Sequence, residues 1–249
     1  MYAEDEARLI IDTARTPIEL ADMLTRRAAG QPLEHVVVWA EFCGLRITVQ
    51  PPVFVPRRRT ELLVHEAAAV GQRVTAAGRP PVVVDLCCGS GAIGAALSEA
   101  LGGAELYAVD IDPAAVRCAR RNLADAQVYE GDLFQPLPER LRGRVDVVVV
   151  SAPYVPTAEI RLLPAEARSH EPRVALDGGS DGLDVVRRVI AASPPWLAPG
   201  GHLLVETSER QAAPTVDAMA AAGLVTRVAS RVETGATVVI GTASPVTHQ

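Results

Sequence analysis

The chain of 249 residues is 49% apolar and 22% charged, a balance typical of a folded domain with a buried core rather than of a disordered chain. All 24 basic residues are arginine, which excludes chemistry that needs a lysine amine, such as a phosphate-loop NTPase or a Schiff-base enzyme. The net charge of -6 disfavours a protein that binds long nucleic acid by neutralising its phosphates.

The N-terminal segment and the cysteines indicate where the protein acts. MYAEDEARLIIDTA carries acidic residues where a signal peptide needs basic ones, and no apolar run approaches the length of a membrane span. We therefore expect a cytoplasmic protein with no membrane partner. The four cysteines form no C-x-x-C pair and have no histidine at ligand spacing, so neither a metal site nor a disulfide framework is indicated.

The segment up to Gly30 has a helical pattern. Thr16 is placed to cap a helix, Pro17 occupies the first helical position, and Glu19 completes a capping box. Gly30 then ends this helical segment.

Residues 41–55 change to short alternating runs. The runs GLRITV and VFV flank Pro51-Pro52, which predicts two short strands joined by a turn at these prolines. Thr60 begins another helix. We therefore expect a short helical segment with a connecting β-hairpin over residues 1–56 and the main domain over residues 57–249.

Apolar runs typical of strands alternate with helical stretches from Pro81 onward, which predicts a largely parallel sheet covered by helices. The continuous β-branched run from Val147 to Val150 is typical of a strand buried on both faces. The last two runs have no helix between them and are expected to pair antiparallel. The seven runs are PVVVDL, ELYAVD, QVYEGD, VDVVVVS, GHLLVE, LVTRVAS and TVVIG.

The first of these strands leads into a glycine-bearing turn and a helix, a geometry that brings backbone N–H groups close to a nucleotide-type ligand. A G-x-G-x-x-G pattern begins at Gly89, so an NAD-dependent oxidoreductase is one interpretation. Asp85 argues against it, because a carboxylate there would repel a pyrophosphate but could attract the ammonium of S-adenosylmethionine through a water or loop amides. Cys87 and Cys88 are assigned to loop packing, since no adjacent base would make either a nucleophile.

Acidic residues also follow the next two strands. Asp110, nineteen residues after Gly91, can accept hydrogen bonds from both hydroxyls of a ribose. Asp132 follows the third strand, where such a fold would hold an adenine ring. An isolated aspartate is more often a helix cap or a solvated strand end, but acids after three consecutive strands favour a cofactor site.

The fourth strand runs into Ser151-Ala152-Pro153-Tyr154. This tetrapeptide resembles the N-P-P-Y type motif of amino-group methyltransferases, which Asn, Asp or Ser opens and an aromatic residue closes. Any strand-to-loop corner could carry such a sequence, so its context decides the interpretation.

Residues 30–241 resemble the release-factor glutamine-N5 methyltransferases, in particular a related branch of unassigned substrate. The block over residues 170–184 is the most specific to this family, because generic methyltransferase folds do not require it. The matching stretches are GQPL, AEF, FVPR with TE, DLCCGSGAIG, AVDIDPAAVRCARRN, GDLF, HEPR, ALDGG and DGLD.

The resemblance implies a class I methyltransferase fold, with a Rossmann-like sheet of seven mostly parallel strands, and S-adenosylmethionine-dependent methylation of the N5 nitrogen of a glutamine in a protein. The implied partner is a protein or peptide that bears a glutamine, release factors included. The implied catalytic residues are Ser151, Ala152, Pro153 and Tyr154. The implied cofactor-binding residues are Asp85, Cys87, Cys88, Gly89, Ser90, Gly91, Asp110, Ile111, Asp132, Leu133 and Ser151.

An amide nitrogen is a poor nucleophile because its lone pair is delocalised into the carbonyl, so both of its N–H bonds must be engaged. The resemblance assigns this to the Ser151 side chain and the Ala152 carbonyl, with the Tyr154 ring packed against the amide and Pro153 stiffening the turn. The serine oxygen reaches about 1–1.5 Å less far than an asparagine oxygen would.

Three departures from the family pattern bear on the partner. Cys87 stands where the family has a glycine, PRRRTE replaces P-R-P-E-T-E, and the segment before Gly30 is shorter than the family's helical N-terminal region, which is implicated in docking the release factor. The three arginines of PRRRTE are either a solvated charge run or a substrate contact. We expect the substrate to be a glutamine other than, or in addition to, that of the Gly-Gly-Gln loop of release factors.

Other functions stay open at this point. An NAD-dependent oxidoreductase shares the glycine pattern and a nucleic-acid amino-methyltransferase shares the tetrapeptide. A protein that keeps the methyltransferase fold with a degraded site would share both.

Overall fold

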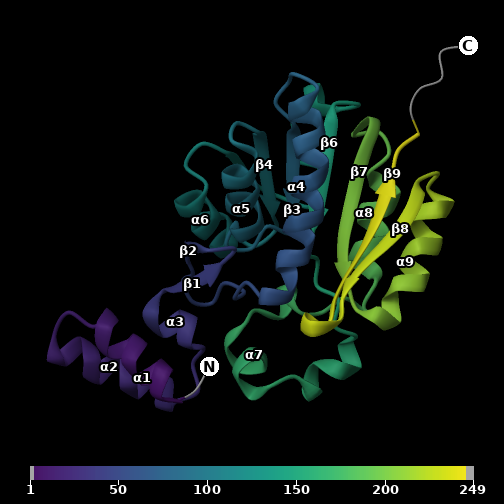
Figure 1. Ribbon diagram of the computed structural model, residues 1–249. Coiled ribbons are helices and arrows are strands. Elements are labelled where there is room, and N and C mark those ends of the chain that lie inside the picture. The colour runs from purple at the N-terminus through teal and green to yellow at the C-terminus, as the bar shows by residue number, and fades with distance from the viewer. Residues whose placement is uncertain (1–2, 245–249) are drawn as a thin grey trace, which may run out of the picture.

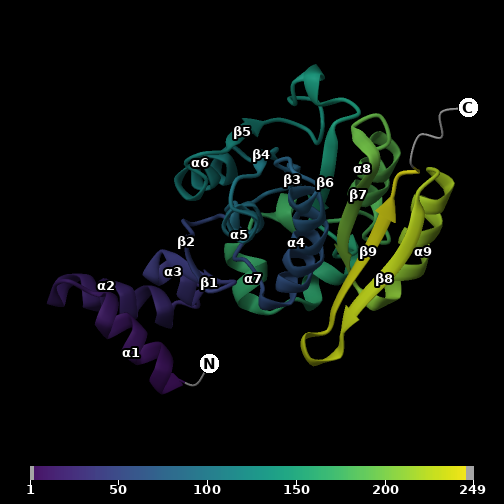
Figure 2. The same cartoon turned by 45° about the horizontal axis from the view of Figure 1, so that its top comes forward.

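The computed structural model describes residues 3–244, and its main body is a sheet with helices on both faces (Figure 1). A smaller unit of helices and a two-stranded hairpin projects from one side of this body (Figures 1 and 2). The α-helices are α1 (Ala3–Thr13), α2 (Pro17–Ala28), α3 (Leu33–Val37), α4 (Glu61–Ala76), α5 (Ala92–Leu101), α6 (Pro113–Asn122), α7 (Ala165–His170), α8 (Asp184–Ala192) and α9 (Glu209–Ala221). The 3-10 helices are η1 (Arg58–Thr60), η2 (Glu139–Leu141), η3 (Thr157–Leu162), η4 (Arg173–Ala175) and η5 (Val232–Thr234).

The large sheet contains the seven predicted strands. They are β3 (Val82–Leu86), β4 (Glu105–Asp110), β5 (Gln127–Glu130), β6 (Val145–Val150), β7 (Leu197–Thr207), β8 (Val225–Arg231) and β9 (Ala236–Thr242). Their order across the sheet is β5-β4-β3-β6-β7-β9-β8. The strands from β5 to β7 pair in parallel, whereas β9 pairs antiparallel with both β7 and β8. The predicted antiparallel pair is therefore confirmed.

The two central strands, β3 and β6, are buried along their whole length. Their valine-rich sequences suit this place, because β-branched side chains pack well on a sheet that helices cover on both faces. Val83 pairs with Val147 and Leu86 with Val150, so the two strands end side by side. The loops that follow them must therefore meet at one edge of the sheet.

Helices α4, α5 and α6 cover one face of the sheet, and α8 and α9 cover the other (Figures 1 and 2). Leu63 of α4 and Leu97 of α5 belong to the first core cluster. Ile190 of α8 and Met219 of α9 belong to the second. This three-layer arrangement leaves the carboxyl ends of the strands free for a binding site.

The hairpin lies earlier in the chain than predicted. It joins β1 (Trp39–Phe42) to β2 (Leu45–Thr48), and residues 53–55 form no strand. The turn is made by Cys43 and Gly44, whose φ values of 51° and 75° are of the kind that a two-residue hairpin turn needs. The prolines at 51 and 52 lie beyond the pairing, whose last hydrogen bond runs from Val49 N to the Val38 carbonyl at 3.1 Å.

The N-terminal unit has a small core of its own. Ile10 of α1, Met23 of α2 and Val36 of α3 pack together in it. Thr16 Oγ1 accepts a hydrogen bond from Glu19 N at 3.1 Å, so the predicted helix cap is confirmed. Glu19 Oε2 accepts from Arg15 N at 2.9 Å and not from Thr16 N, so the predicted capping box is not formed. The predicted domain boundary falls between the hairpin and η1. Within residues 3–244, no helix combines the length and the apolar character needed to cross a membrane.

The segment between β6 and α8, residues 151–183, crosses the carboxyl edge of the sheet. Gln211 Nε2 of α9 donates to the Tyr154 carbonyl at 2.9 Å and so holds the start of the segment. Its middle reaches the N-terminal unit, where Arg27 Nη1 of α2 lies 3.4 Å from Glu166 Oε1 of α7. The segment therefore connects the sheet to the N-terminal unit.

Gly178, within this segment, packs against the turn after β6 with no room for a side chain. A Cβ there would lie 2.6 Å from the Gly182 oxygen and 2.7 Å from the Pro153 oxygen. Because both neighbours are backbone atoms, we expect Gly178→Ala to lower the free energy of unfolding by about 3 kcal/mol, measured by urea unfolding. Gly78→Ala is the control: its Cβ would meet open space, and its φ of 90° alone should cost about 1 kcal/mol. Equal losses would contradict the steric explanation.

Candidate active site

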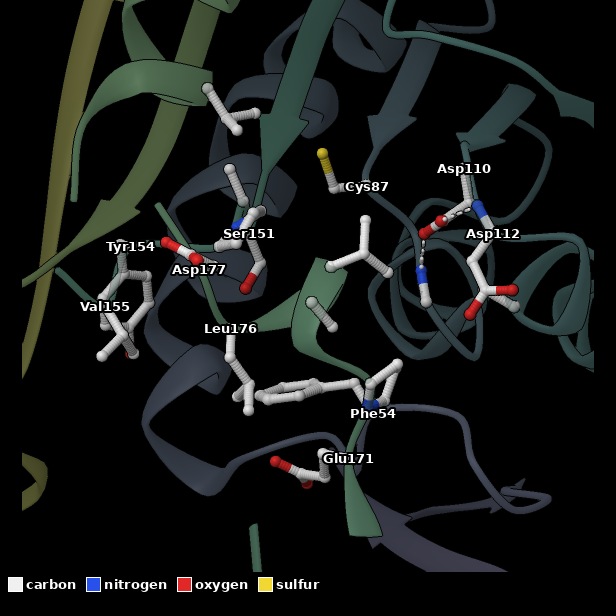
Figure 3. A pocket seen from close by; sticks show the side chains of 18 of the residues that line it. Phe54, Cys87, Asp110, Asp112, Ser151, Tyr154, Val155, Glu171, Leu176 and Asp177 are labelled. Atoms are coloured by element: carbon white, nitrogen blue, oxygen red, sulfur yellow. Dashed lines mark hydrogen bonds between the residues drawn. The ribbon is translucent and has the colours of Figure 1, made fainter. Parts of the chain in front are cut away.

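A cavity of about 530 Å³ opens at the carboxyl ends of β3, β4, β6 and β7 (Figure 3). The strand order reverses between β3 and β6, which is where open α/β sheets bind ligands. Figure 3 shows Cys87, Asp110 and Ser151 around one space, with Phe54 and Glu171 on another side of it. The predicted site residues that line the cavity are Cys87, Gly89, Asp110, Ile111, Asp132, Leu133, Ser151, Ala152, Pro153 and Tyr154.

The loop between β3 and α5 folds tightly. Gly91 N donates to the Cys88 carbonyl at 2.7 Å, and Cys88 N donates to the Val109 carbonyl of β4 at 3.1 Å. Cys87 has a φ of 56°, a left-handed conformation that costs a residue with a side chain about 1–2 kcal/mol. The loop therefore keeps its shape without a glycine at this position by holding Cys87 in the conformation that a glycine would adopt.

The two thiols of this loop are poor nucleophiles. Burial raises the pKa of Cys87 and of Cys88 well above the ordinary value, and the Asp85 and Asp110 carboxylates act in the same direction. Only a thiolate attacks efficiently, so both residues fit the packing role expected from the sequence.

Asp85 does not reach the cavity lining, contrary to expectation. Its Oδ2 accepts from Gly94 N at 3.0 Å, because the first turn of α5 has N–H groups without partners inside the helix. Its Oδ1 is buried and has no hydrogen-bond partner among residues 3–244. Burial, and secondarily the Asp110 carboxylate, raise the pKa of Asp85 to about 7, although the Gly94 N–H opposes this.

Three other predicted residues also lie behind the lining. Cys88 and Ser90 are buried, and the Ser90 carbonyl accepts from Asn122 Nδ2 of α6 at 2.8 Å. Gly91 faces α6 as well, since a Cβ there would lie 2.9 Å from the Leu123 side chain. These residues shape the loop from the side of α6 and leave its cavity face to Cys87 and Gly89.

Asp110 stands at the cavity wall, as expected. Its Oδ2 accepts from Gly89 N at 2.8 Å and its Oδ1 from Asp112 N at 2.9 Å. Burial raises the pKa of Asp110, while these two N–H groups favour its ionised form. A carboxylate has about four lone-pair positions, so each oxygen can accept one further hydrogen bond from a ligand.

Asp132 and Leu133 follow β5 on the same wall. The Asp132 carboxylate is paired with Arg188 of α8, a partner that the sequence did not reveal. Ile111, just after β4, is 55% exposed and lines the cavity as well. The wall therefore combines two apolar side chains with two carboxylates.

The turn after β6 faces this wall across the cavity. Ser151 Oγ donates to Glu206 Oε2 of β7 at 3.3 Å. Burial raises the pKa of the Tyr154 hydroxyl to about 12, with a further contribution from the Glu206 carboxylate. Tyr154 is therefore neutral at physiological pH and can offer its ring to a ligand.

Glu206 is a site residue that the sequence analysis missed, and its partner is Arg59, one of the three arginines of PRRRTE. Glu206 is 2% exposed and lies near the end of β7, in the run GHLLVE. An acidic residue at the end of a predicted strand is the same signal that indicated Asp85 and Asp110 as site residues. Arg59 Nε lies 3.4 Å from Glu206 Oε1, and the guanidinium stands 5.5 Å from the centroid of the Tyr154 ring.

The arginine run is therefore only partly a solvated surface. Arg57 pairs with the buried carboxylate of Glu171, which also accepts from Val55 N at 3.3 Å. Arg59 pairs with Glu206, whereas Arg58 is exposed. Glu171 belongs to the block HEPR, so its contact with Arg57 joins two sequence motifs that lie far apart in the chain.

The cavity suits S-adenosylmethionine, the cofactor expected from the sequence. Asp110 offers acceptors to ribose hydroxyls, and Ile111 and Leu133 offer apolar surface to a purine ring. Gly89 leaves the loop open to a ligand, because a Cβ there would have no neighbour within 4 Å.

Comparison with known proteins supports this assignment. The family model described as "Methyltransferase domain" matches residues 83–171. Release factor glutamine methyltransferase of Geobacter sulfurreducens is 41% identical over 81% of this chain and 70% of that protein. The protein of the same name from Mycolicibacterium smegmatis is 39% identical over 91% of this chain and 80% of that protein. A 4-amino-L-phenylalanine/4-methylamino-L-phenylalanine methyltransferase of Streptomyces pristinaespiralis is 35% identical over 83% of this chain and 71% of that protein.

Solved structures show the same fold at low sequence identity. The hMettl16 catalytic domain has a TM-score of 0.63 and 13% identity, covering 82% of this chain and 78% of that chain. The 16S rRNA N2 G1207 methyltransferase of T. thermophilus, solved with AdoMet and guanosine, has a TM-score of 0.55 and 19% identity over 82% of this chain and 49% of that chain. The class I methyltransferase fold predicted from the sequence is confirmed.

The buried Asp85 predicts a specific dependence of stability on pH. Its pKa is about 7 in the folded protein and 3.8 as a free side chain, so the folded state holds this proton more tightly than the unfolded state. Its contribution to stability is therefore lost as the pH rises from about 4 to about 7, by at most about 1.4 kcal/mol per pH unit. Asp85→Asn has no such proton.

We compare the free energy of unfolding in urea of Asp85→Asn with that of the unmodified protein. The difference, variant minus unmodified protein, should rise over this pH range and level off above it. A difference that does not change with pH would show that Asp85 is ionised in the folded protein throughout.

Proposed function

The chain belongs to the release factor glutamine methyltransferase family, and from this premise we propose that it methylates the side-chain amide nitrogen of a glutamine in a protein. It is an S-adenosylmethionine-dependent methyltransferase, which decides against the oxidoreductase interpretation of its glycine pattern. The observation that carries the proposal is that Asp110 and the turn after β6 border one cavity. A cofactor and a substrate amide can thus be held face to face.

When bound, S-adenosylmethionine would supply a methyl group on a positively charged sulfur. The new N–C bond would form as the S–C electron pair returns to sulfur, and the nitrogen would then lose a proton to water. The residues of the chain position the acceptor. Ser151 Oγ and the Ala152 carbonyl accept from the two N–H bonds of the amide, which turns its nitrogen toward the methyl group. The Tyr154 ring packs against the plane of the amide and limits its rotation.

The charges near the cavity entrance favour a substrate protein other than, or in addition to, the release factors. Arg59 lines the cavity with its side chain 44% exposed, although it pairs with Glu206, and the next residue in the chain, Arg58, is exposed outside the lining. Two arginines therefore stand at or beside the cavity where the family pattern has a proline and a glutamate. Specificity is a difference of affinities, and a reversed charge at the rim attracts some partners and repels others. We propose a protein glutamine in an acidic surrounding, in addition to or instead of that of release factors.

An aromatic amine of small size is the second candidate substrate. The substrate side of the cavity is lined by apolar residues, among them Phe54, Val155 and Leu176, and would accommodate an aromatic ring. The relative from Streptomyces pristinaespiralis acts, by its name, on amino-phenylalanine substrates. The nearby Glu206 carboxylate could accept from an amine as readily as Ser151 accepts from an amide.

Transfer of a labelled methyl group separates these candidates. The purified protein is incubated with methyl-labelled S-adenosylmethionine and, in parallel, with a bacterial release factor, a bacterial protein extract, nucleic acid and 4-aminophenylalanine. We expect label on a glutamine side-chain nitrogen, located by mass spectrometry of peptides. Label on lysine, carboxylates or bases, or on the aromatic amine alone, would overturn the glutamine proposal. Efficient labelling of the release factor and of nothing else in the extract would contradict the wider partner.

Tyr154 should matter for turnover more than for cofactor binding. We expect Tyr154→Ala to lower methyl transfer at least about tenfold, because the amide loses the surface that orients it. Tyr154→Phe keeps the ring and is the matched control, with activity close to that of the unmodified enzyme. A large fall in the melting temperature of the alanine variant would show instead that Tyr154 is a structural residue.

Asp110 should carry part of the cofactor affinity. We expect Asp110→Ala to weaken S-adenosylmethionine binding by about 1.5–3 kcal/mol, the scale of hydrogen bonds to a charged group, measured by calorimetry. Asp125→Ala is the control, because this exposed acid lies between α6 and β5 and is not among the residues that line the cavity. An unchanged affinity in Asp110→Ala, or an equal loss in the control, would reject the assignment of Asp110 to the ribose.

A further inference from the structure

A buried carboxylate beside the substrate turn has no part in the methyl transfer described so far. Glu206 is 2% exposed and lies in the cavity wall. It receives a hydrogen bond from Ser151 Oγ at 3.3 Å and faces Arg59 Nε at 3.4 Å. The three side chains come from the end of β6, from β7 and from η1, so the fold brings them together from distant parts of the chain.

We propose that Glu206 and Arg59 are positioning residues that fix the Ser151 hydroxyl as a hydrogen-bond acceptor for the substrate nitrogen. The inference rests on the proposed methylation of an amide. It adds the means by which a hydroxyl, which can donate as well as accept, is kept in the accepting role.

The direction of the Ser151 hydrogen bond is the centre of the argument. A hydroxyl has one hydrogen, and an ionised carboxylate can only accept, so the hydrogen of Ser151 points to Glu206. The lone pairs of the hydroxyl oxygen are then left for a substrate N–H. Without Glu206 the hydrogen could point at the substrate nitrogen and engage the lone pair that must attack the methyl carbon. The contact therefore favours the arrangement that can react.

Arg59 compensates the charge of the buried Glu206 carboxylate. An ionised carboxylate removed from water is costly unless an opposite charge and hydrogen bonds compensate it. Arg59 supplies that charge to Glu206, and its guanidinium also lies over the Tyr154 ring. The same arginine thus supplies an opposite charge to the carboxylate behind Ser151 and contacts the ring against which the amide would pack.

A purely structural role explains this contact less well. Strands β6 and β7 already pair through their backbones, with Val150 opposite Val205, directly before Ser151 and Glu206. The sheet therefore does not need a side-chain contact at this point. A small hydroxyl and a buried acid at the edge of a cavity are better explained by what enters the cavity.

The first experiment compares the effect of one substitution in two backgrounds. The substrate is the glutamine peptide that the unmodified enzyme labels in the transfer assay. Glu206→Gln keeps the shape of the side chain but lets it donate, and we expect kcat to fall about tenfold with a smaller change in KM. Ser151→Asn provides an amide oxygen, which accepts without an oriented hydrogen.

In the Ser151→Asn background we therefore expect Glu206→Gln to change kcat by less than about twofold. An equal loss in both backgrounds would show that Glu206 acts independently of Ser151 and would overturn the proposal.

The second experiment needs neither cofactor nor substrate. Thermal unfolding is followed for Ser151→Ala, for Glu206→Met, whose side chain has a similar length but no oxygen to accept the hydrogen bond, and for the double variant. If Ser151 donates to Glu206, both single changes disturb the same hydrogen bond, and the double variant should melt about 2–4 °C above the sum of the single shifts. Additive shifts overturn the proposal whatever the activities are. An enzyme that labels no amide contradicts the proposed function itself, and non-additive shifts would then identify the contact as structural.

Discussion

The parallel pairing of β3 with β6 is the constraint on which the site depends. Because the two strands run in the same direction and end in register, the loop that carries Cys87 and the turn that begins at Ser151 must lie next to each other. The backbone groups of both strands are satisfied within the sheet, and their side chains are buried on both faces. Chemistry is therefore left to the residues just beyond the strand ends, and β4 and β7 add theirs from either side.

Much of this arrangement is predictable from the sequence, because buried parallel strands have a distinctive composition. Continuous valine-rich runs mark β3 and β6 without any knowledge of their partners. Residues at or just beyond the carboxyl ends of neighbouring parallel strands, such as Asp110 at the end of β4 and Ser151 after β6, must gather at one edge of the sheet. The same reasoning applied to GHLLVE would have added Glu206 to the site. No sequence motif marks the end of β7, so this residue does not stand out in the sequence.

Other features depend on long-range contacts that local patterns do not contain. The sequence does not show that the Asp85 carboxylate turns to the amide of Gly94, since a strand-end acid can face a cavity or a helix equally well. It also does not show that Arg57 and Arg59 pair with acids more than a hundred residues away. The difference between the predicted and the observed position of the hairpin has another cause. Pro51-Pro52 is a strong turn signal, but Cys43-Gly44 adopts the backbone conformation that closes a tight hairpin.

The ion pairs at the two ends of α7, Arg27 with Glu166 and Arg57 with Glu171, differ in how they respond to ionic strength. The pair between Arg27 and Glu166 is partly open to solvent, with side chains 27% and 42% exposed, so dissolved ions screen it. The Glu171 side chain, in contrast, is fully buried, although its partner Arg57 is 34% exposed, so ions have less access to this pair. Added salt should therefore weaken the contact of α7 with the N-terminal unit more than the contact of Glu171, at the C-terminal end of α7, with Arg57. Helix α7 is therefore held by two ion pairs, and the one to the N-terminal unit responds more strongly to the composition of the surrounding solution.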